Sequence, residues 1–285
     1  MNYRHAFHAG NFADVVKHLA LVCILLHLRR KDAGFVVIDT HAGRGTYDLT
    51  SEAAQRTGEA ARGIGRILGL LDQGAVLPDV LQRYLQIVKT SGEGVYPGSP
   101  LIAASLLRPQ DRFVGIEKNT EEAGALRVAL AAFRNKALRS ECGDGYARLN
   151  ALLPPSERRG LVLIDPPFES PDEFQRQARA LAQALKRFAN GTYLVWFPIK
   201  SAGEAHAFCG EVLAAGAKKA VRVDFHGGDA AGAKDAKERL DAAGLVVVNP
   251  WFGFVDEMSA TLRMVAPLLS AKARADIRWL AGEES

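Results

Sequence analysis

The chain has 285 residues, of which 36 are basic and 32 acidic, so its net charge at pH 7 is +4. Hydrophobic residues make up 48% and charged residues 24%, a composition that suits a folded domain with a sizeable core and excludes an extensively disordered protein. No apolar stretch reaches the roughly 18 residues that a membrane span needs, and the polar N-terminal residues lack the pattern of a signal peptide.

The three cysteines, Cys23, Cys142 and Cys209, are far apart in the sequence. This odd, scattered set favours neither a disulfide framework nor a zinc site. We therefore expect a cytoplasmic protein without a bound metal. The small positive charge permits a polyanionic partner but does not require one.

The first half of the chain predicts a helix, a strand and then an interruption. Residues 14–30 have the pattern of a helix, with Asp14 as its N-cap, and residues 35–39 that of a buried strand. The next clear strand is 112–117, far beyond an ordinary crossover. Helical spacing at 61–71 and 77–89 predicts that 46–95 is a helical insertion into a main domain of residues 1–45 and 96–285.

Strands and helices alternate regularly in the second half. This alternation predicts an α/β fold, with a mostly parallel seven-stranded sheet covered by helices on both faces. A short stretch at 277–280 is an additional strand candidate. Beyond the two strands above, the predicted strands are 138–142, 160–164, 192–197, 220–225 and 245–249.

The segment Asp165-Pro166-Pro167-Phe168 is the most informative motif. It follows the apolar run 160–164, so its carboxylate lies where open α/β sheets bind ligands. Neither proline can donate a backbone hydrogen bond, which stiffens the turn. A rigid loop that offers a carboxylate, a free carbonyl and an aromatic ring suits the exocyclic amine of a flat base.

Glycines and acids also follow the other early strands. Gly43 and Gly45 form a tight turn after the first strand, where the backbone can approach a ligand closely. Glu117 and Asp144 end the next two strands, in positions suited to ribose hydroxyls and an adenine amine. A glycine turn with acids after four successive strands is the layout of an S-adenosyl-L-methionine-dependent methyltransferase.

Four segments together resemble the RlmJ family, bacterial methyltransferases that form N6-methyladenosine in 23S ribosomal RNA (rRNA). The resemblance extends from Tyr3 to Trp251 and is more specific than any single motif. The segments are 3–18 (YRHAFHAGNFADVVKH), 40–43 (THAG), 96–100 (YPGSP) and 165–168 (DPPF).

The resemblance implies a Rossmann-like class I methyltransferase fold, S-adenosyl-L-methionine as cofactor, 23S rRNA as partner and a monomer. It makes Asp165 the catalytic acid and places Tyr3 on the substrate side, with His5 and Lys17 nearby. Phe168 replaces the tyrosine that is common in the family, and its ring can still stack on the base. The cofactor contacts it implies are His18, His41, Ser99, Glu117, Asp144, Gly145 and Asp165.

The residues leave other functions open. The motif of residues 165–168 also fits DNA adenine or a guanine amine as substrate, and the fold could serve as a silent RNA-binding scaffold. An NAD(P) oxidoreductase fits less well, because Asp48 stands where a dinucleotide fingerprint needs its third glycine. Basic residues including Arg44, Arg62 and Arg66 are candidates for a phosphate-facing rim, with a solvated helical face as the alternative.

Overall fold

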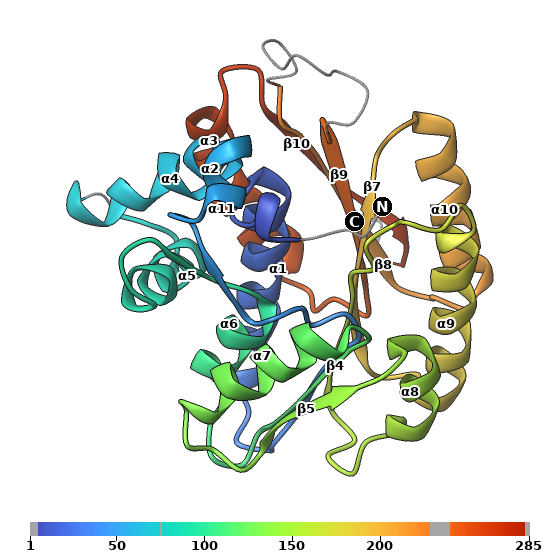
Figure 1. The fold of residues 1–285 in the computed structure, drawn as a ribbon. Coiled ribbons are helices and arrows are strands. Elements are labelled where there is room, and N and C mark those ends of the chain that lie inside the picture. Colours follow the sequence, from blue (N-terminus) through green and yellow to red (C-terminus); the bar gives the residue numbers. More distant parts are fainter. Residues whose placement is uncertain (1–4, 75, 229–239, 283–285) are drawn as a thin grey trace.

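The computed structural model describes residues 5–74, 76–228 and 240–282 (Figure 1). In this part of the chain an eight-stranded sheet has the order β5-β4-β1-β6-β7-β9-β8-β10. The strands are β1 (Val36–Asp39), β4 (Arg112–Glu117), β5 (Leu138–Cys142), β6 (Gly160–Ile164), β7 (Thr192–Pro198), β8 (Ala220–His226), β9 (Ala242–Val248) and β10 (Arg274–Ala281).

The first five strands of this order are parallel to one another, and β9 is antiparallel to both β7 and β8. Numbered along the chain, the sheet strands follow the order 3-2-1-4-5-7-6-8. The predicted Rossmann-like class I methyltransferase fold is confirmed, but the prediction of seven strands is wrong by one. The additional strand, β10, pairs antiparallel with β8. Its side chains are exposed or half-buried at the sheet edge, so its sequence shows only a weak pattern of apolar residues.

Helices cover both faces of the sheet (Figure 1). Because side chains alternate along a strand, Val37 and Leu163 join the hydrophobic cluster on one face, while Ile38 and Ile164 join the cluster on the other. The first face carries α1 (Phe12–Arg29), α5 (Asp79–Thr90), α6 (Ser99–Leu106), α7 (Thr120–Ala131) and α11 (Phe254–Leu269). The second carries α8 (Gly145–Leu152), α9 (Glu173–Arg187) and α10 (Ala202–Ala214).

None of the helices described is both long enough and apolar enough to cross a membrane.

Helix α1 is almost wholly buried, because apolar residues lie on all its sides. The prediction that Asp14 caps it is wrong. Asn11 is the N-cap, and its side chain accepts a hydrogen bond of 2.9 Å from the Asp14 backbone N–H. Asp14 thus lies in the first turn with its carboxylate buried. A short 3-10 helix, η1 (His5–Phe7), precedes α1.

Residues 46–95 form a two-stranded antiparallel sheet and several short helices. The sheet consists of β2 (Thr46–Asp48) and β3 (Val95–Pro97). The helices before α5 are α2 (Glu52–Thr57), α3 (Glu59–Arg62), α4 (Ile64–Ile67) and the 3-10 helix η2 (Leu68–Asp72). Side chains of α4 and α5 join the same hydrophobic cluster as α1. The division of the chain into a main domain and an insertion stays a prediction.

The single helix predicted at 61–71 is wrong, because the backbone breaks at Gly63. Ile64 N–H donates to the Gly10 carbonyl at 2.9 Å. A Cβ on Gly63 would lie 2.0 Å from that carbonyl oxygen, so only glycine permits this contact. It ties residues 46–95 to the segment that precedes α1.

Gly145, the first residue of α8, also makes a close backbone contact, since a Cβ there would lie 1.9 Å from the Thr40 carbonyl oxygen. We expect Gly145→Ala to lower the free energy of unfolding by about 1–3 kcal/mol, the usual cost of overpacking. The control is Gly210→Ala inside α10, where a Cβ meets no atom within 4 Å. This substitution should raise the free energy of unfolding by about 0.5–1 kcal/mol. Urea unfolding measures both; equal effects would contradict the close contact.

Candidate active site

A large cavity lies at the carboxyl ends of the parallel strands. Here β1 adjoins both β4 and β6, so successive connections leave in opposite directions, and open α/β sheets bind ligands at such a point. The cavity has a volume of about 1090 Å³, enough for a nucleoside cofactor and a base. Its lining includes residues that follow each of four strands, namely His41, Glu117, Asp144 and Asp165.

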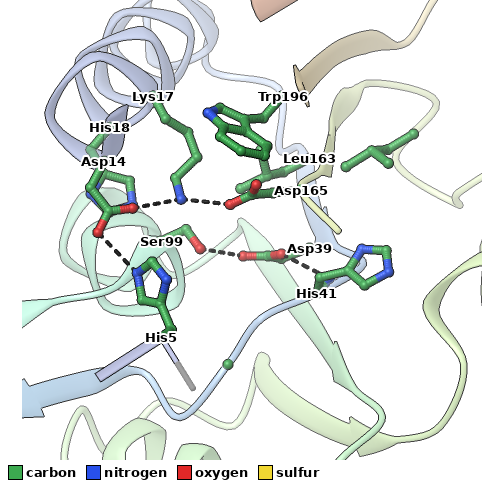
Figure 2. A network of polar contacts seen from close by, with 12 residues as sticks. His5, Asp14, Lys17, His18, Asp39, His41, Ser99, Leu163, Asp165 and Trp196 are labelled. Carbon is green, nitrogen blue, oxygen red and sulfur yellow. Dashed lines mark hydrogen bonds and ion pairs between the residues drawn. The ribbon is translucent and has the colours of Figure 1, made fainter. Parts of the chain in front are cut away.

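Asp165 meets a buried lysine at the floor of this cavity (Figure 2). Lys17 Nζ of α1 donates to Asp165 Oδ2 at 2.5 Å and to Asp14 Oδ1 at 2.8 Å. Only 5% of Lys17 is exposed. Asp165 Oδ1 accepts no hydrogen bond from the residues that the structure describes, so this oxygen is available to a ligand.

Asp14 completes the network on the far side of Lys17. Its Oδ2 lies 2.9 Å from His5 Nε2 and accepts the Gly10 backbone N–H at 2.9 Å. Burial opposes the charge of Asp14, yet His5 and Lys17 hold its pKa well below the ordinary value. Burial likewise opposes the charge of Lys17, but Asp14 and Asp165 hold its pKa well above the ordinary value. The Asp14–Lys17 pair is therefore ionised at neutral pH.

A second buried acid, Asp39, ends β1. It accepts the Ser99 hydroxyl at 2.7 Å and the His41 backbone N–H at 3.3 Å. Burial and the nearby Asp165 charge raise the pKa of Asp39 to about 7, against a lowering effect of the Ser99 hydrogen bond. Ser99 is thus positioned by Asp39 and makes no capping bond with its side chain at the start of α6.

Two histidines line the cavity in the neutral form. Burial lowers the pKa of His41 to about 4 and that of His18 to about 3. His41 Nδ1 bonds the Thr40 hydroxyl at 2.8 Å, and His18 Nδ1 bonds the Tyr96 hydroxyl at 2.7 Å. His18 Nε2 is buried without a partner among the described residues, so it fits a ligand group inside the cavity.

Glu117 is fixed by backbone donors on both sides. Its Oε2 accepts Gly43 N–H at 2.9 Å and its Oε1 accepts Asn119 N–H at 2.8 Å. Gly43 has a φ of +60°, and a Cβ there would lie 2.4 Å from the Tyr47 hydroxyl oxygen. Each carboxylate oxygen keeps a further lone pair, so Glu117 can still accept a pair of hydroxyls.

Asp144 has a similar double role. One of its oxygens caps α8 by accepting two backbone N–H groups at 3.1 Å. The other lies 3.6 Å from an Arg176 nitrogen and 3.9 Å from Lys118 Nζ. The adjoining Gly145 lets the start of α8 approach Thr40 closely, which closes this end of the cavity.

Phe168 lies in a small aromatic cluster beside the cavity. Its backbone is left-handed, with a φ of +51°. Its ring meets Phe174 and Trp196 edge-on, with centroids 4.8 and 5.7 Å apart. Phe168 and Trp196 both line the cavity, and Figure 2 shows Trp196 close to Lys17 and Asp165. These contacts fix the plane of the Phe168 ring.

The structure brings almost all the predicted site residues to one cavity. Tyr3 lies outside the described residues. Within the described ranges, no three His, Cys, Asp or Glu side chains are grouped so that they could hold a metal. The predicted residues that line the cavity are His5, Lys17, His18, His41, Ser99, Glu117, Asp144, Gly145, Asp165 and Phe168.

Sequence reasoning missed three residues of the site. Asp14 was interpreted as a cap, although its spacing of three residues from Lys17 on one helix face could have indicated an ion pair. Asp39 is the last residue of the predicted strand 35–39 and was assigned no role. Trp196 carried no local signal, because it resembles any aromatic residue of a buried strand.

The predicted basic rim is only partly available. Arg44 pairs with both oxygens of Glu122, at 3.0 and 2.9 Å, and Arg66 donates to the Leu269 carbonyl. Arg62 donates to the Thr57 carbonyl at 2.7 Å and lines the cavity. Arg44 and Arg66 therefore form hydrogen bonds within the protein.

The raised pKa of Asp39 makes stability depend on pH. Between the ordinary pKa of 3.8 and the folded value of about 7, the folded state holds a proton that the unfolded state has lost, so stability falls as pH rises through this window. Asp39→Asn should therefore be more stable than the parent at pH 8, by on the order of 2–4 kcal/mol. This advantage should disappear near pH 4. Denaturant unfolding at both pH values tests this; an equal difference would contradict it.

Comparison with known proteins places the chain in a family. Residues 32–281 match the model of a family described as ribosomal RNA large subunit methyltransferase D, RlmJ. Two relatives are each named ribosomal RNA large subunit methyltransferase J. The Haemophilus influenzae protein is 36% identical and the Escherichia coli protein 37% identical, and each alignment covers 99% of this chain and 100% of the relative.

A solved structure has the same fold over nearly the whole chain. The crystal structure of a Legionella pneumophila protein is similar with a TM-score of 0.84 and 32% sequence identity. The match covers 95% of this chain and 98% of the other. The chain therefore belongs to the RlmJ family of ribosomal RNA large subunit methyltransferases.

Proposed function

We propose that the protein transfers the methyl group of S-adenosyl-L-methionine to the exocyclic N6 of an adenine in 23S rRNA, giving N6-methyladenosine. The observation that carries this proposal is the end of β6. There Asp165 keeps one carboxylate oxygen free and Pro166 follows in the same rigid turn, and both line the cavity. The names of the relatives from H. influenzae and E. coli support large-subunit rRNA as the substrate.

The residues of the cavity fit the cofactor. Asp144 can accept the adenine amine and Glu117 the two ribose hydroxyls. His18 follows Lys17, and Ser99 bonds Asp39, whose pKa is raised in part by the Asp165 charge, so both lie toward the reacting end. The charged neighbours of His41 include Asp144. The unpartnered Nε2 of His18 indicates a bound ligand. When bound, the cofactor supplies an electrophilic methyl group on a sulfonium, whose C–S bond breaks as the new C–N bond forms.

Asp165 and the Pro166 carbonyl accept the two N–H bonds of the target amine. The lone pair of this amine is delocalised into the ring, so the acceptors must hold the nitrogen in a geometry that favours attack. Such positioning can supply about 7–11 kcal/mol of the barrier. The same acceptors stabilise the positive charge that develops on nitrogen, and the proton leaves after the methyl group has been transferred.

Lys17 determines which oxygen of Asp165 accepts an N–H of the target amine. Its ammonium group occupies Oδ2, so Oδ1 is the oxygen that faces the amine. Tyr3, which the family resemblance places on the substrate side, and His5 belong to the same N-terminal segment. Phe168 offers a ring whose plane is fixed for stacking on the base, which must leave its helix or loop stack to enter the cavity.

Three further features belong to this proposal. Residues 46–95 form a helical insertion that contacts the RNA, residues 1–45 and 96–285 form the catalytic domain, and the protein acts as a cytoplasmic monomer. Arg62 supports the role of the insertion, because it lies on α3 and lines the cavity.

Labelled S-adenosyl-L-methionine with deproteinised large-subunit rRNA should yield N6-methyladenosine on nucleoside analysis. We expect Asp165→Asn to lower the single-turnover rate at least about 100-fold, the range of lost transition-state acceptors. The Asn amide would turn its oxygen to Lys17 and its NH₂ toward the substrate amine, a contact between two donors. Cofactor affinity by calorimetry should fall by about 10-fold at most, because the variant keeps a neutral polar contact in place of the charged one.

Methylated guanine or cytosine in the product would contradict the adenine assignment. Near-normal turnover of Asp165→Asn would contradict the role of Asp165.

Phe168→Ala should raise the KM for RNA by about 5–100-fold, since stacking on one base is worth about 1–3 kcal/mol. Phe168→Tyr is the matched control, because it keeps the ring and should stay near the parent value. Steady-state kinetics with an rRNA fragment measures both variants. If alanine and tyrosine changed KM equally, the ring would not be the stacking surface.

A further inference from the structure

The buried hydrogen-bond chain behind His18 gives a further inference. His18 Nδ1 lies 2.7 Å from the Tyr96 hydroxyl, and the Tyr96 and Tyr84 hydroxyls lie 2.9 Å apart. All three side chains are essentially unexposed. Tyr84 comes from α5, inside the segment 46–95, and Tyr96 comes from β3 and is the first residue after that segment.

Only one arrangement of the hydrogens in this series of hydrogen bonds gives every buried hydroxyl an acceptor. Tyr84 has no other hydrogen-bond partner among the described residues, so its hydrogen must go to the Tyr96 oxygen. Tyr96 then donates to His18 Nδ1, and neutral His18 carries its proton on Nε2. In the opposite direction, His18 donates to Tyr96, Tyr96 donates to Tyr84, and the Tyr84 hydrogen has no acceptor inside the core, which buried donors avoid.

The preferred direction leaves a donor in the cavity. His18 lines the cavity, and its Nε2 is the buried ring nitrogen without a partner in the described part of the chain. Burial lowers the pKa of His18 to about 3, so the ring stays neutral and carries one proton. A neutral ring with Nε2–H can donate to an acceptor but cannot accept from an ammonium group.

The chemistry of the cofactor identifies the group that His18 meets. Asp14 and Asp165 line the same end of the cavity as His18, and Lys17 is bound between the two acids (Figure 2). Of the two charged groups on the methionine part of the cofactor, the ammonium group can only donate hydrogen bonds, so the carboxylate is the one that can accept from His18 Nε2–H. We propose that Tyr96, which is itself bound by the Tyr84 hydroxyl, is a positioning residue that holds His18 in the Nε2–H form, so that it donates to the methionine carboxylate of the cofactor. The carboxylate half of this proposal rests on the proposed function.

The tautomer can be measured in the protein without any ligand. Nitrogen-15 NMR of histidine-labelled protein at pH 7, with His18 assigned from a His18→Asn variant, should show the proton on Nε2. Tyr96→Phe keeps the ring but removes the hydroxyl that donates to Nδ1, so the Nδ1–H form should appear beside the first. The matched control is Tyr193→Phe, which loses a buried hydroxyl bond to the Phe188 carbonyl far from this chain and should leave His18 unchanged.

A proton on Nδ1 in the parent protein would overturn the proposal. So would a Tyr96→Phe spectrum identical to the parent spectrum, because a purely structural tyrosine would not move the tautomer.

Calorimetry with two ligands tests the carboxylate. The parent should bind S-adenosyl-L-methionine at least about 10-fold more tightly than its decarboxylated analogue, as expected for a hydrogen bond to a charged group. In His18→Asn the amide stays near the Nδ1 position, and most of that preference should be lost through weaker binding of the carboxylated ligand alone. Equal weakening of both ligands, or no preference in the parent, would overturn the carboxylate assignment.

If the parent bound neither ligand, the proposed function itself would fail. The tautomer measurement would still decide whether Tyr96 controls His18.

Discussion

The candidate site depends on one buried cation. Lys17 leaves the first turns of α1 and holds together the carboxylates of Asp14 and Asp165, which are 151 residues apart in the sequence. A charge this deeply buried is tolerated only with partners, and two carboxylates compensate it here. The ion network therefore constrains how α1 sits against the end of β6.

This constraint explains why α1 is so apolar. The helix must lie flat against the sheet, between the helices of the same face, for Lys17 to reach the end of β6. Asn11 fixes the first turn of α1. Its side chain caps the helix and donates to Glu59 Oε2 at 2.9 Å. The Gly10–Gly63 contact adds a second tie to the segment 46–95. That segment also carries Tyr84, which contacts the site through its hydrogen bond to Tyr96 and the bond from Tyr96 to His18.

Sequence patterns predicted the parallel part of the sheet well. The strands ending at Glu117 and Asp165 begin and end where expected, because a buried apolar run closed by an acid and a turn is a local signal. The break at Gly63 could not be foreseen, since its cause is a carbonyl 53 residues earlier in the sequence. The N-cap was misplaced for a related reason: Asn11 and Asp14 are both good caps, and only the buried Lys17 explains why Asp14 is needed inside.

The candidate site divides in the same way. Acids at strand ends were predictable because the fold brings the carboxyl ends of parallel strands together. Asp39 and Trp196 were missed, because their importance comes from neighbours far along the chain. The assignment of single residues to cofactor or substrate came from family resemblance, and the geometry adds physical reasons for several of them, such as the free oxygen of Asp165 and the unpartnered nitrogen of His18.

The central claim is that Lys17 acts on methyl transfer through Asp165. The most direct test compares single-turnover rates of the parent, Lys17→Met, Asp165→Asn and the double variant, each confirmed as folded by its unfolding transition. If Lys17 acts through Asp165, the double variant will be no slower than Asp165→Asn, because without the ammonium group the Asn amide can turn its oxygen to the amine. Losses that multiply in the double variant would show that the two residues act independently and would contradict this account.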